Sequence, residues 1–187
     1  MRFLMSVLLL AAYFAVAEEP KASSNPDNCP LHAQHMKDRD KDARFTGVKE
    51  RGAESAGMGF SQEATTHHFI STPTGGVIQV TVNDAKDAAT KKQVEDHMQR
   101  IAKMFSAGDF SIPHFVHNEE VPGVAYMREH LSEIAYRAEN LNNGARVVIT
   151  AKTPAALAEV HRFLEYQIAE HRTGDAPGTR ASNEHKH

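Results

Sequence analysis

Residues 65–84, TTHHFISTPTGGVIQVTVND, carry the clearest structural signal in this chain. Apolar and polar residues alternate on both sides of the Pro-Thr-Gly-Gly segment at residues 73–76, as they do in strands with one buried face. Proline and glycine in that segment are typical of a tight turn. The sequence therefore predicts a β-hairpin whose strands cover about residues 65–72 and 77–83.

A helix is predicted directly after this hairpin, over about residues 87–107. Its apolar residues recur at intervals of four, three and four, which places them on one side of an α-helix. They are Val94, Met98, Ile101 and Phe105. Gly108 is a typical residue at a helix end. A shorter helix is expected from about Pro122, and its core-facing residues would be Val124, Met127 and Leu131.

The same order of elements returns in the second half of the chain. Residues 134–152, IAYRAENLNNGARVVITAK, predict a second hairpin, in which Asn143-Gly144 favours a type I′ turn with positive φ angles. Thr153 and Pro154 suit the cap and the first turn of a helix that is predicted to end near residue 172. The apolar side of that helix is expected to consist of Leu157, His161, Leu164 and Ile168.

Two β-β-α units joined by a short helix define the expected fold class. It is α+β, with a four-stranded antiparallel sheet and helices on one face. We assign this domain to residues 58–175. Residues 18–57 are predicted to form a flexible arm, because they are rich in charge, Pro, Ser, Gly and Asn and poor in large apolar residues. Residues 176–187 are predicted to be a disordered tail.

The first 17 residues have the pattern of a secretory signal peptide. Arg2 precedes the apolar run FLMSVLLLAAYFAV, which leads into the small-residue triplet Ala15-Val16-Ala17. The run has about 14 residues, fewer than the roughly 20 that span a bilayer. We therefore expect cleavage after Ala17, a periplasmic or secreted location, and no membrane attachment after cleavage.

Composition narrows the expected partners of the exported chain. Removing 17 of 187 residues leaves 170, which is enough for one domain with its own core. Arg2 is the one charged residue that cleavage removes, so the totals of 21 basic and 24 acidic residues become 20 and 24. This mild acidity disfavours nucleic acid as a partner. The single cysteine, Cys29, cannot form an internal disulfide in an oxidising compartment.

Cys29 belongs to a group of metal-ligand residues in NPDNCPLHAQHMK, residues 25–37. Four donor side chains lie within eight residues: Cys29, His32, His35 and Met36. A helix that begins at Pro30 would place three of these donors on one side. Thiolate with thioether favours Cu(I), whereas thiolate with imidazole also suits Zn(II). The sequence thus predicts a copper site, with zinc as the alternative ion and a solvated arm that binds nothing as the competing interpretation.

Two resemblances accompany these residues. The CPLH at Cys29 to His32 is similar to the Cys-Pro-Met-His-Pro element of periplasmic copper and silver efflux proteins and of heavy-metal-binding modules, but it has Leu31 and Ala33 where that element has Met and Pro. The strings MGFSQEATTHHF, GDFSIPHFVH, VPGV and HRTGD resemble a family of small exported bacterial proteins of unassigned function, over most of residues 28–175. That resemblance implies an exported single domain and no particular activity.

Two histidine pairs in the folded part are further candidate metal ligands. His67 and His68 are neighbours on a strand, so their side chains should point to opposite faces of the sheet, one buried and one exposed. His114 and His117 are three residues apart and could share an ion if that segment turns helically. In both pairs, hydrogen-bonded structural histidines are the alternative interpretation.

The sequence favours a binding protein over an enzyme. It contains no Gly-x-Ser-x-Gly, His-Glu-x-x-His or phosphate-binding glycine loop, and no base is evident beside Cys29. Our leading hypothesis is an exported soft-metal-binding protein for copper handling, whose partners are a metal ion and another periplasmic protein. The alternative is a metal-independent binding module that uses the open face of the sheet.

Overall fold

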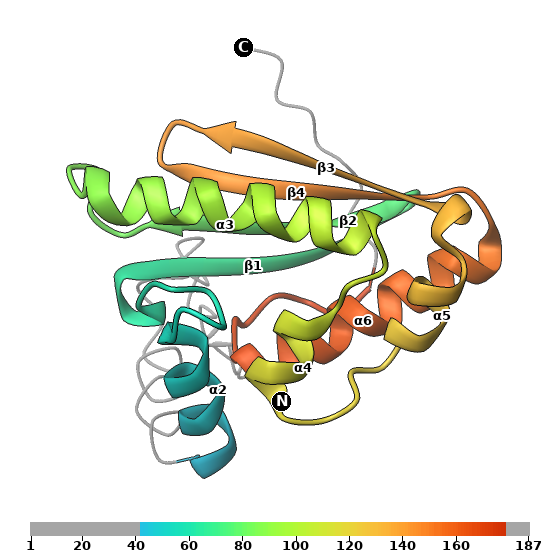
Figure 1. Cartoon of the computed structure of the whole chain (residues 1–187), viewed down its shortest axis with the longest axis horizontal. Coiled ribbons are helices and arrows are strands. Elements are labelled where there is room, and N and C mark those ends of the chain that lie inside the picture. The colour runs from blue at the N-terminus through green and yellow to red at the C-terminus, as the bar shows by residue number, and fades with distance from the viewer. Residues whose placement is uncertain (1–41, 179–187) are drawn as a thin grey trace, which may run out of the picture.

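The computed structural model describes residues 42–178, in which one antiparallel sheet lies behind a layer of helices (Figure 1). The four strands stand in the order β1-β2-β4-β3. They are β1 Thr65–Thr72, β2 Gly75–Val82, β3 Ile134–Leu141 and β4 Gly144–Ala151. The predicted α+β class with two β-β-α units is confirmed.

Two long helices cover one face of this sheet, and each covers the hairpin of the other unit. Helix α3, Ala88–Ser106, follows the first hairpin but packs chiefly on β3 and β4. Helix α6, Pro154–His171, follows the second hairpin but packs chiefly on β1 and β2. The connection between the units contains helices α4, Ser111–His117, and α5, Val124–Glu129. Short 3₁₀ turns at Gln62–Ala64 and Leu131–Glu133 precede the two hairpins.

Alternation along the strands sorts the side chains between the two faces. In β2, Ile78, Val80 and Val82 are buried under the helices, whereas the residues between them are half-buried on the open face. The Asp87 carboxylate accepts a hydrogen bond from the backbone N–H of Thr90 and so caps the start of α3. The core therefore fills the single layer between the sheet and the helices.

The second hairpin turns one residue earlier than predicted. Its strands end at Leu141 and restart at Gly144, so Asn142 and Asn143 form the turn, and neither has a positive φ angle. Gly144 is needed for a different reason, because a Cβ atom there would lie 2.1 Å from the backbone oxygen of Val80 in β2. The prediction of a type I′ turn at Asn143-Gly144 was therefore wrong.

The folded domain also begins before residue 58, where the sequence placed its start. Helix α2, Ala43–Ala53, lies within the predicted arm of residues 18–57, and its Phe45 and Val48 are each 1% exposed. Asp42 caps this helix by accepting a hydrogen bond from the backbone N–H of Arg44. Only one narrow side of α2 is apolar, which explains why its composition resembled that of a solvated arm.

Two further features differ from or extend the expectations for helices. Leu131 was expected to face the core, but it is 38% exposed because α5 ends at Glu129 and Leu131 begins the following 3₁₀ turn. Within residues 42–178, no helix combines the length and the apolar character needed to cross a bilayer.

Candidate functional site

The buried side of α6 changes from apolar to polar along its length. The helix buries Ala156, Val160, Phe163 and Leu164 in its first part and Gln167 and His171 in its last part. Three of the four residues predicted for this side are only half-buried, namely Leu157, His161 and Ile168. The buried row is shifted by one position, and it carries two polar side chains into the core.

Gln167 and His171 line a cavity of about 60 Å³ between the sheet and the helices. Four imidazoles lie in its wall: His67 from β1, His97 from α3, His117 from α4 and His171 from α6. Met58 and Met98 add two thioethers, and the rest of the wall is mostly aliphatic or aromatic. No carboxylate belongs to the described residues of this wall.

Three of these imidazoles are in contact. The ring of His171 lies 5.2 Å from the ring of His117 and 5.8 Å from the ring of His67, measured between centroids. Each belongs to a different element, so α6, α4 and β1 bring together residues that are far apart in the sequence. We call His67, His117 and His171 the histidine cluster.

Two nitrogens of this cluster have no hydrogen-bond partner within residues 42–178. Nδ1 of His117 and Nδ1 of His171 are both buried and unpaired. Nε2 of His117 lies 3.0 Å from Oε1 of Gln167, whose amide nitrogen is also buried and unpaired. His67 differs, since its Nε2 lies 3.0 Å from the hydroxyl of Thr65. Buried polar atoms without partners cost about 1–3 kcal/mol each, so their concentration here points to a bound group or water.

Burial keeps the histidines of the wall neutral. It lowers the pKa of His67 to about 4, with a smaller contribution from the charge of His68. Burial and the neighbouring Arg100 lower the pKa of His97 to about 3. The pKa values of His117 and His171 are also lowered, chiefly by burial. Neutral imidazole is the form that can bind a metal ion or accept a hydrogen bond.

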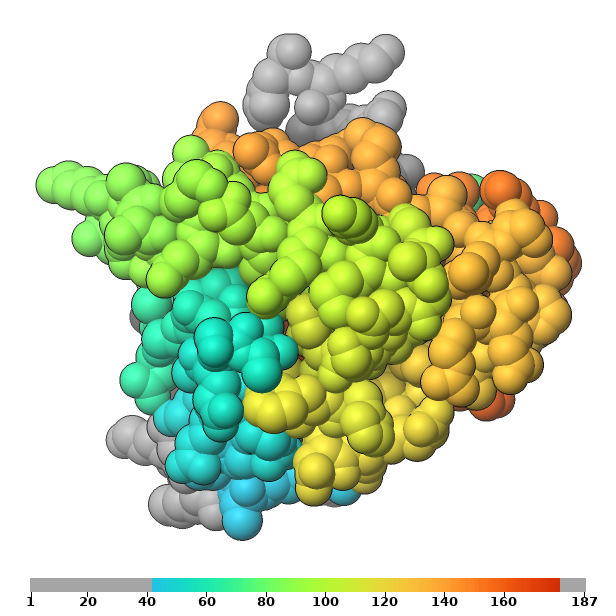
Figure 2. All heavy atoms as spheres, in the orientation of Figure 1, coloured from blue at the N-terminus to red at the C-terminus, as the bar shows by residue number. Residues whose placement is uncertain are grey.

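The turn after α2 separates this cavity from a depression on the surface. Met58 and His97 belong to the walls of both spaces, and the depression has a volume of about 280 Å³. Arg100 of α3 connects this helix to the turn. Its guanidinium donates hydrogen bonds to the backbone oxygen of Gly57 in the turn at 2.8 Å and to Nδ1 of His97 at 3.2 Å. Figure 2 shows this turn in cyan against α3 in green. Met58 and His97 thus lie between the two spaces.

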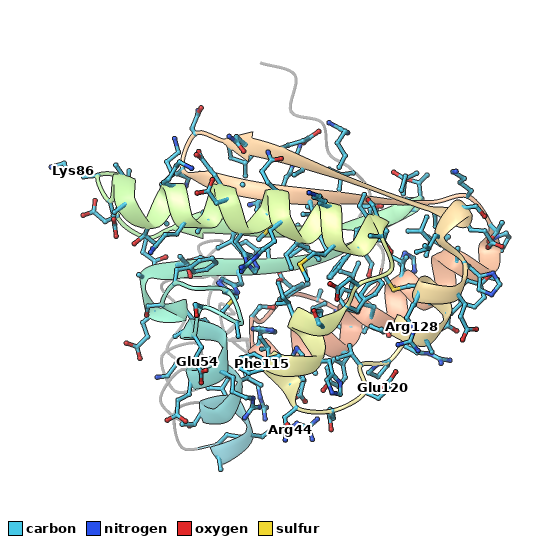
Figure 3. The ribbon with its side chains drawn as sticks, viewed as in Figure 1. Arg44, Glu54, Lys86, Phe115, Glu120 and Arg128 are labelled. Atoms are coloured by element: carbon cyan, nitrogen blue, oxygen red, sulfur yellow. The ribbon has the colours of Figure 1, made fainter. Side chains whose placement is uncertain are left out.

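A charged network closes the opposite side, around α2, α4 and α6. Arg44 donates to Glu170 at 2.5 Å and also to Glu119, which in turn accepts a hydrogen bond from the hydroxyl of Tyr166. Figure 3 shows Arg44 where α2 approaches the segment after α4. The ring of Tyr166 packs edge-on against the ring of His117, with 5.0 Å between centroids. The network thus holds α2 over the outer side of the histidine cluster.

The predicted alternation of His67 and His68 is confirmed. His67 is buried under the helices and belongs to the cavity wall. His68 points to the other side, where its Nδ1 lies 3.0 Å from Oδ1 of Asp175. The same carboxylate accepts a hydrogen bond from the backbone N–H of Phe69 at 3.0 Å, so it covers the outer edge of β1.

His114 and His117 lie on a helix, yet they do not share a site. His117 faces the interior cavity, whereas His114 is exposed and lines a surface groove of about 370 Å³ beside Glu120 and Arg128. Nδ1 of His114 lies 3.1 Å from the backbone oxygen of Glu119. Figure 3 shows that Glu120 and Arg128 border the same part of the surface.

The predicted arm ligands Cys29, His32, His35 and Met36 lie outside the described residues. Within residues 42–178, no three or more His, Cys, Asp and Glu side chains are placed so that they could hold a metal ion together.

The sequence analysis did not identify His171 and Gln167 as buried residues of α6. The available signal was the spacing of four, three, four and four from Ala156 through Val160, Phe163 and Gln167 to His171, which continues one helix side. His97 is also buried, and its Nδ1 accepts a hydrogen bond from the guanidinium of Arg100. Its place in the cavity wall was not foreseen.

Comparisons with protein-family models, curated proteins and solved structures gave no match for this chain. The chemistry of the cavity is therefore inferred from its own residues.

Proposed function

We propose that this chain is an exported soft-metal-binding protein that handles copper, with zinc as the alternative ion. The observation that carries the proposal is the pair of unpaired, buried imidazole nitrogens on His117 and His171 in a cavity that also contains two methionines. Imidazole and thioether are ligands of soft and borderline metal ions. Buried donors that lack protein partners are costly for a domain unless something pairs with them.

The chain connects the proposed arm ligands to the described domain at Asp42. Asp42 forms an ion pair with Arg172, the residue directly after His171. Met36 is six residues before Asp42, and covalent geometry limits that separation to about 20 Å. In this proposal Cys29, His32, His35 and Met36 capture the ion at the surface, and the folded domain receives it.

A binding measurement on the exported chain tests the proposal. The full-length gene is expressed without an affinity tag, the exported form is purified under reducing conditions, and mass spectrometry determines whether the chain begins at Glu18. Cu(I) and Zn(II) affinities are then measured by competition with chromophoric chelators. We expect one tightly bound ion per chain.

Three variants assign the binding. Cys29→Ser removes the thiolate of the arm, and His171→Leu removes an imidazole of the cavity. His114→Gln removes a surface histidine and serves as the matched control, which should bind like the wild type. The proposal fails if the wild type binds only weakly and each histidine substitution, including His114→Gln, lowers the amount bound by a similar fraction, because that is the behaviour of adventitious sites.

A further inference from the structure

We infer that the interior cavity is a monovalent copper site formed by Nδ1 of His117, Nδ1 of His171 and a methionine thioether, in which Gln167 positions His117. This inference rests on the proposed function and names the ion and the ligands. Gln167 does not touch the ion in this arrangement, so we describe it as a positioning residue.

The hydrogen bond to Gln167 determines which nitrogen of His117 is available. In the proposed arrangement Nε2 of His117 carries the proton and donates it to Oε1 of Gln167, which lies 3.0 Å away. The lone pair of this neutral imidazole is then on Nδ1, which is buried and has no partner within residues 42–178. Metal-binding histidines are commonly oriented by such a hydrogen bond from the other ring nitrogen.

His171 is placed to complete a pair of ligands. Its Nδ1 is also buried and unpaired, and its ring lies 5.2 Å from that of His117 at an interplanar angle of 84°. A metal ion lies about 2 Å from an imidazole nitrogen, so two rings that share an ion have centroids up to roughly 6 Å apart. The observed separation falls within this limit.

The charge of the cavity wall favours a monovalent ion. The described wall contains imidazoles, thioethers and an amide but no carboxylate, so nothing there balances the second charge of Zn(II). The cost of burying an ion rises steeply with its charge, and a soft ion with neutral ligands keeps that cost low. Met58 and Met98 supply the soft donors that Cu(I) prefers.

The size of the cavity supports an ion over an organic ligand. Its volume is about 60 Å³, whereas pockets for drug-sized molecules usually measure about 300–1,000 Å³. Two imidazoles and one thioether also agree with the finding that residues 42–178 hold no metal-binding group of three or more His, Cys, Asp and Glu side chains.

The experiment measures Cu(I) affinity in the exported chain with Cys29→Ser as background, so that sulfur from the arm cannot contribute. Replacing His117 or His171 by leucine should weaken binding by more than about 100-fold, because loss of an orienting partner alone typically costs about 10- to 100-fold. Gln167→Leu should weaken binding by about 10- to 100-fold. Gln167→Glu should restore it, since a carboxylate still accepts the proton of His117 Nε2, and it should raise Zn(II) affinity by adding negative charge.

X-ray absorption at the copper edge identifies the donor atoms. We expect two nitrogen neighbours and one sulfur neighbour, and the sulfur signal should disappear in either Met58→Leu or Met98→Leu. Met104→Leu is the matched control, because Met104 packs against the core outside the cavity wall. Thermal unfolding of every variant verifies that the domain is folded.

The outcomes separate this inference from the proposed function. If the wild type binds no soft metal, both fail. If the wild type binds Cu(I) but Cys29→Ser abolishes binding, or if the His171 and Gln167 variants bind like the background, then the arm is the site and the cavity inference is overturned. Preference of the cavity for Zn(II) over Cu(I) would overturn the assignment of a monovalent ion.

Discussion

Two clusters of aromatic rings in the same buried layer differ in whether they contain polar atoms that lack hydrogen-bond partners. Phe105, Phe110 and Phe163 form a phenylalanine cluster in which Phe105 stacks on Phe110 at 4.3 Å and meets Phe163 edge-on at 6.0 Å. The histidine cluster has similar ring spacings but leaves nitrogens unpaired. Helix α6 supplies Phe163 to one cluster and His171, two turns later, to the other. One helix side therefore carries apolar side chains in its first half and incompletely paired polar side chains in its second.

Removing a ring from the phenylalanine cluster should have the largest effect on stability. Phe105 is 1% exposed, and truncating such a residue leaves a cavity that the surrounding core does not refill. We expect Phe105→Ala to lower the free energy of unfolding by about 4 kcal/mol, measured by urea denaturation at pH 7. Phe115, which is labelled in Figure 3 and is only partly buried at the edge of the core, is the control, and Phe115→Ala should cost about 1 kcal/mol. Equal costs would contradict the assigned role of the phenylalanine cluster.

Acid should weaken the domain through the buried histidines. His67 and His97 have folded-state pKa values of about 4 and about 3, below the unfolded value of 6.5. The unfolded chain therefore binds more protons, and stability is complete above pH 6.5 and is lost as the pH falls toward 4. Between pH 7 and pH 5.5 we expect a loss of about 2.5 kcal/mol from these two residues.

The variant His67→Leu measures how much of this pH dependence comes from His67. It should reduce the loss between pH 7 and pH 5.5 by about 1.2 kcal/mol, measured by urea denaturation at each pH. Carboxylates contribute little in this window, because Asp87, Asp109, Glu119 and Glu133 all have pKa values below their usual ones. An unchanged slope in His67→Leu would show that His67 is not kept neutral by burial.

The difference between the clusters also explains what the sequence could reveal. Alternation in residues 65–84 and 134–152 and the spacing of Val94, Met98, Ile101 and Phe105 predicted the sheet and α3, because apolar residues report burial directly. Gln167 and His171 are polar, so their residue type did not indicate burial, although they continue the buried side of α6. Their burial depends on α4 and β1 closing over them, which is a tertiary effect.

The edge of the sheet provides a smaller test beside the histidine cluster. Within residues 42–178, strand β1 pairs with β2 alone, and the backbone N–H of Phe69 on its outer edge donates to Asp175. Asp175→Ala would leave this buried donor unpaired and should cost about 2 kcal/mol of unfolding free energy. Asp175→Asn keeps an acceptor and should cost less. Hydrogen exchange at the Phe69 amide provides the local measurement, and an unchanged exchange rate in Asp175→Ala would contradict the role of this carboxylate.

The smallest expected change in the free energy of unfolding is an increase. It comes from a substitution that makes the histidine cluster more like the phenylalanine cluster. His171→Phe converts the centre of the histidine cluster into a phenylalanine beside Phe69, whose ring lies 5.2 Å from that of His171. An unpaired buried nitrogen is removed and the adjoining cavity of about 60 Å³ accepts the larger ring. We therefore expect a gain of about 1 kcal/mol in stability at pH 7, measured without metal. Under the proposed function, His171→Phe should be more stable than the wild type and should no longer bind Cu(I) in the cavity, because binding sites are commonly formed at a cost in stability. The opposite result would be a lower free energy of unfolding in both His171→Phe and His171→Leu, with both variants still folded. It would mean that the imidazole of His171 is a structural element whose nitrogen is paired in solution.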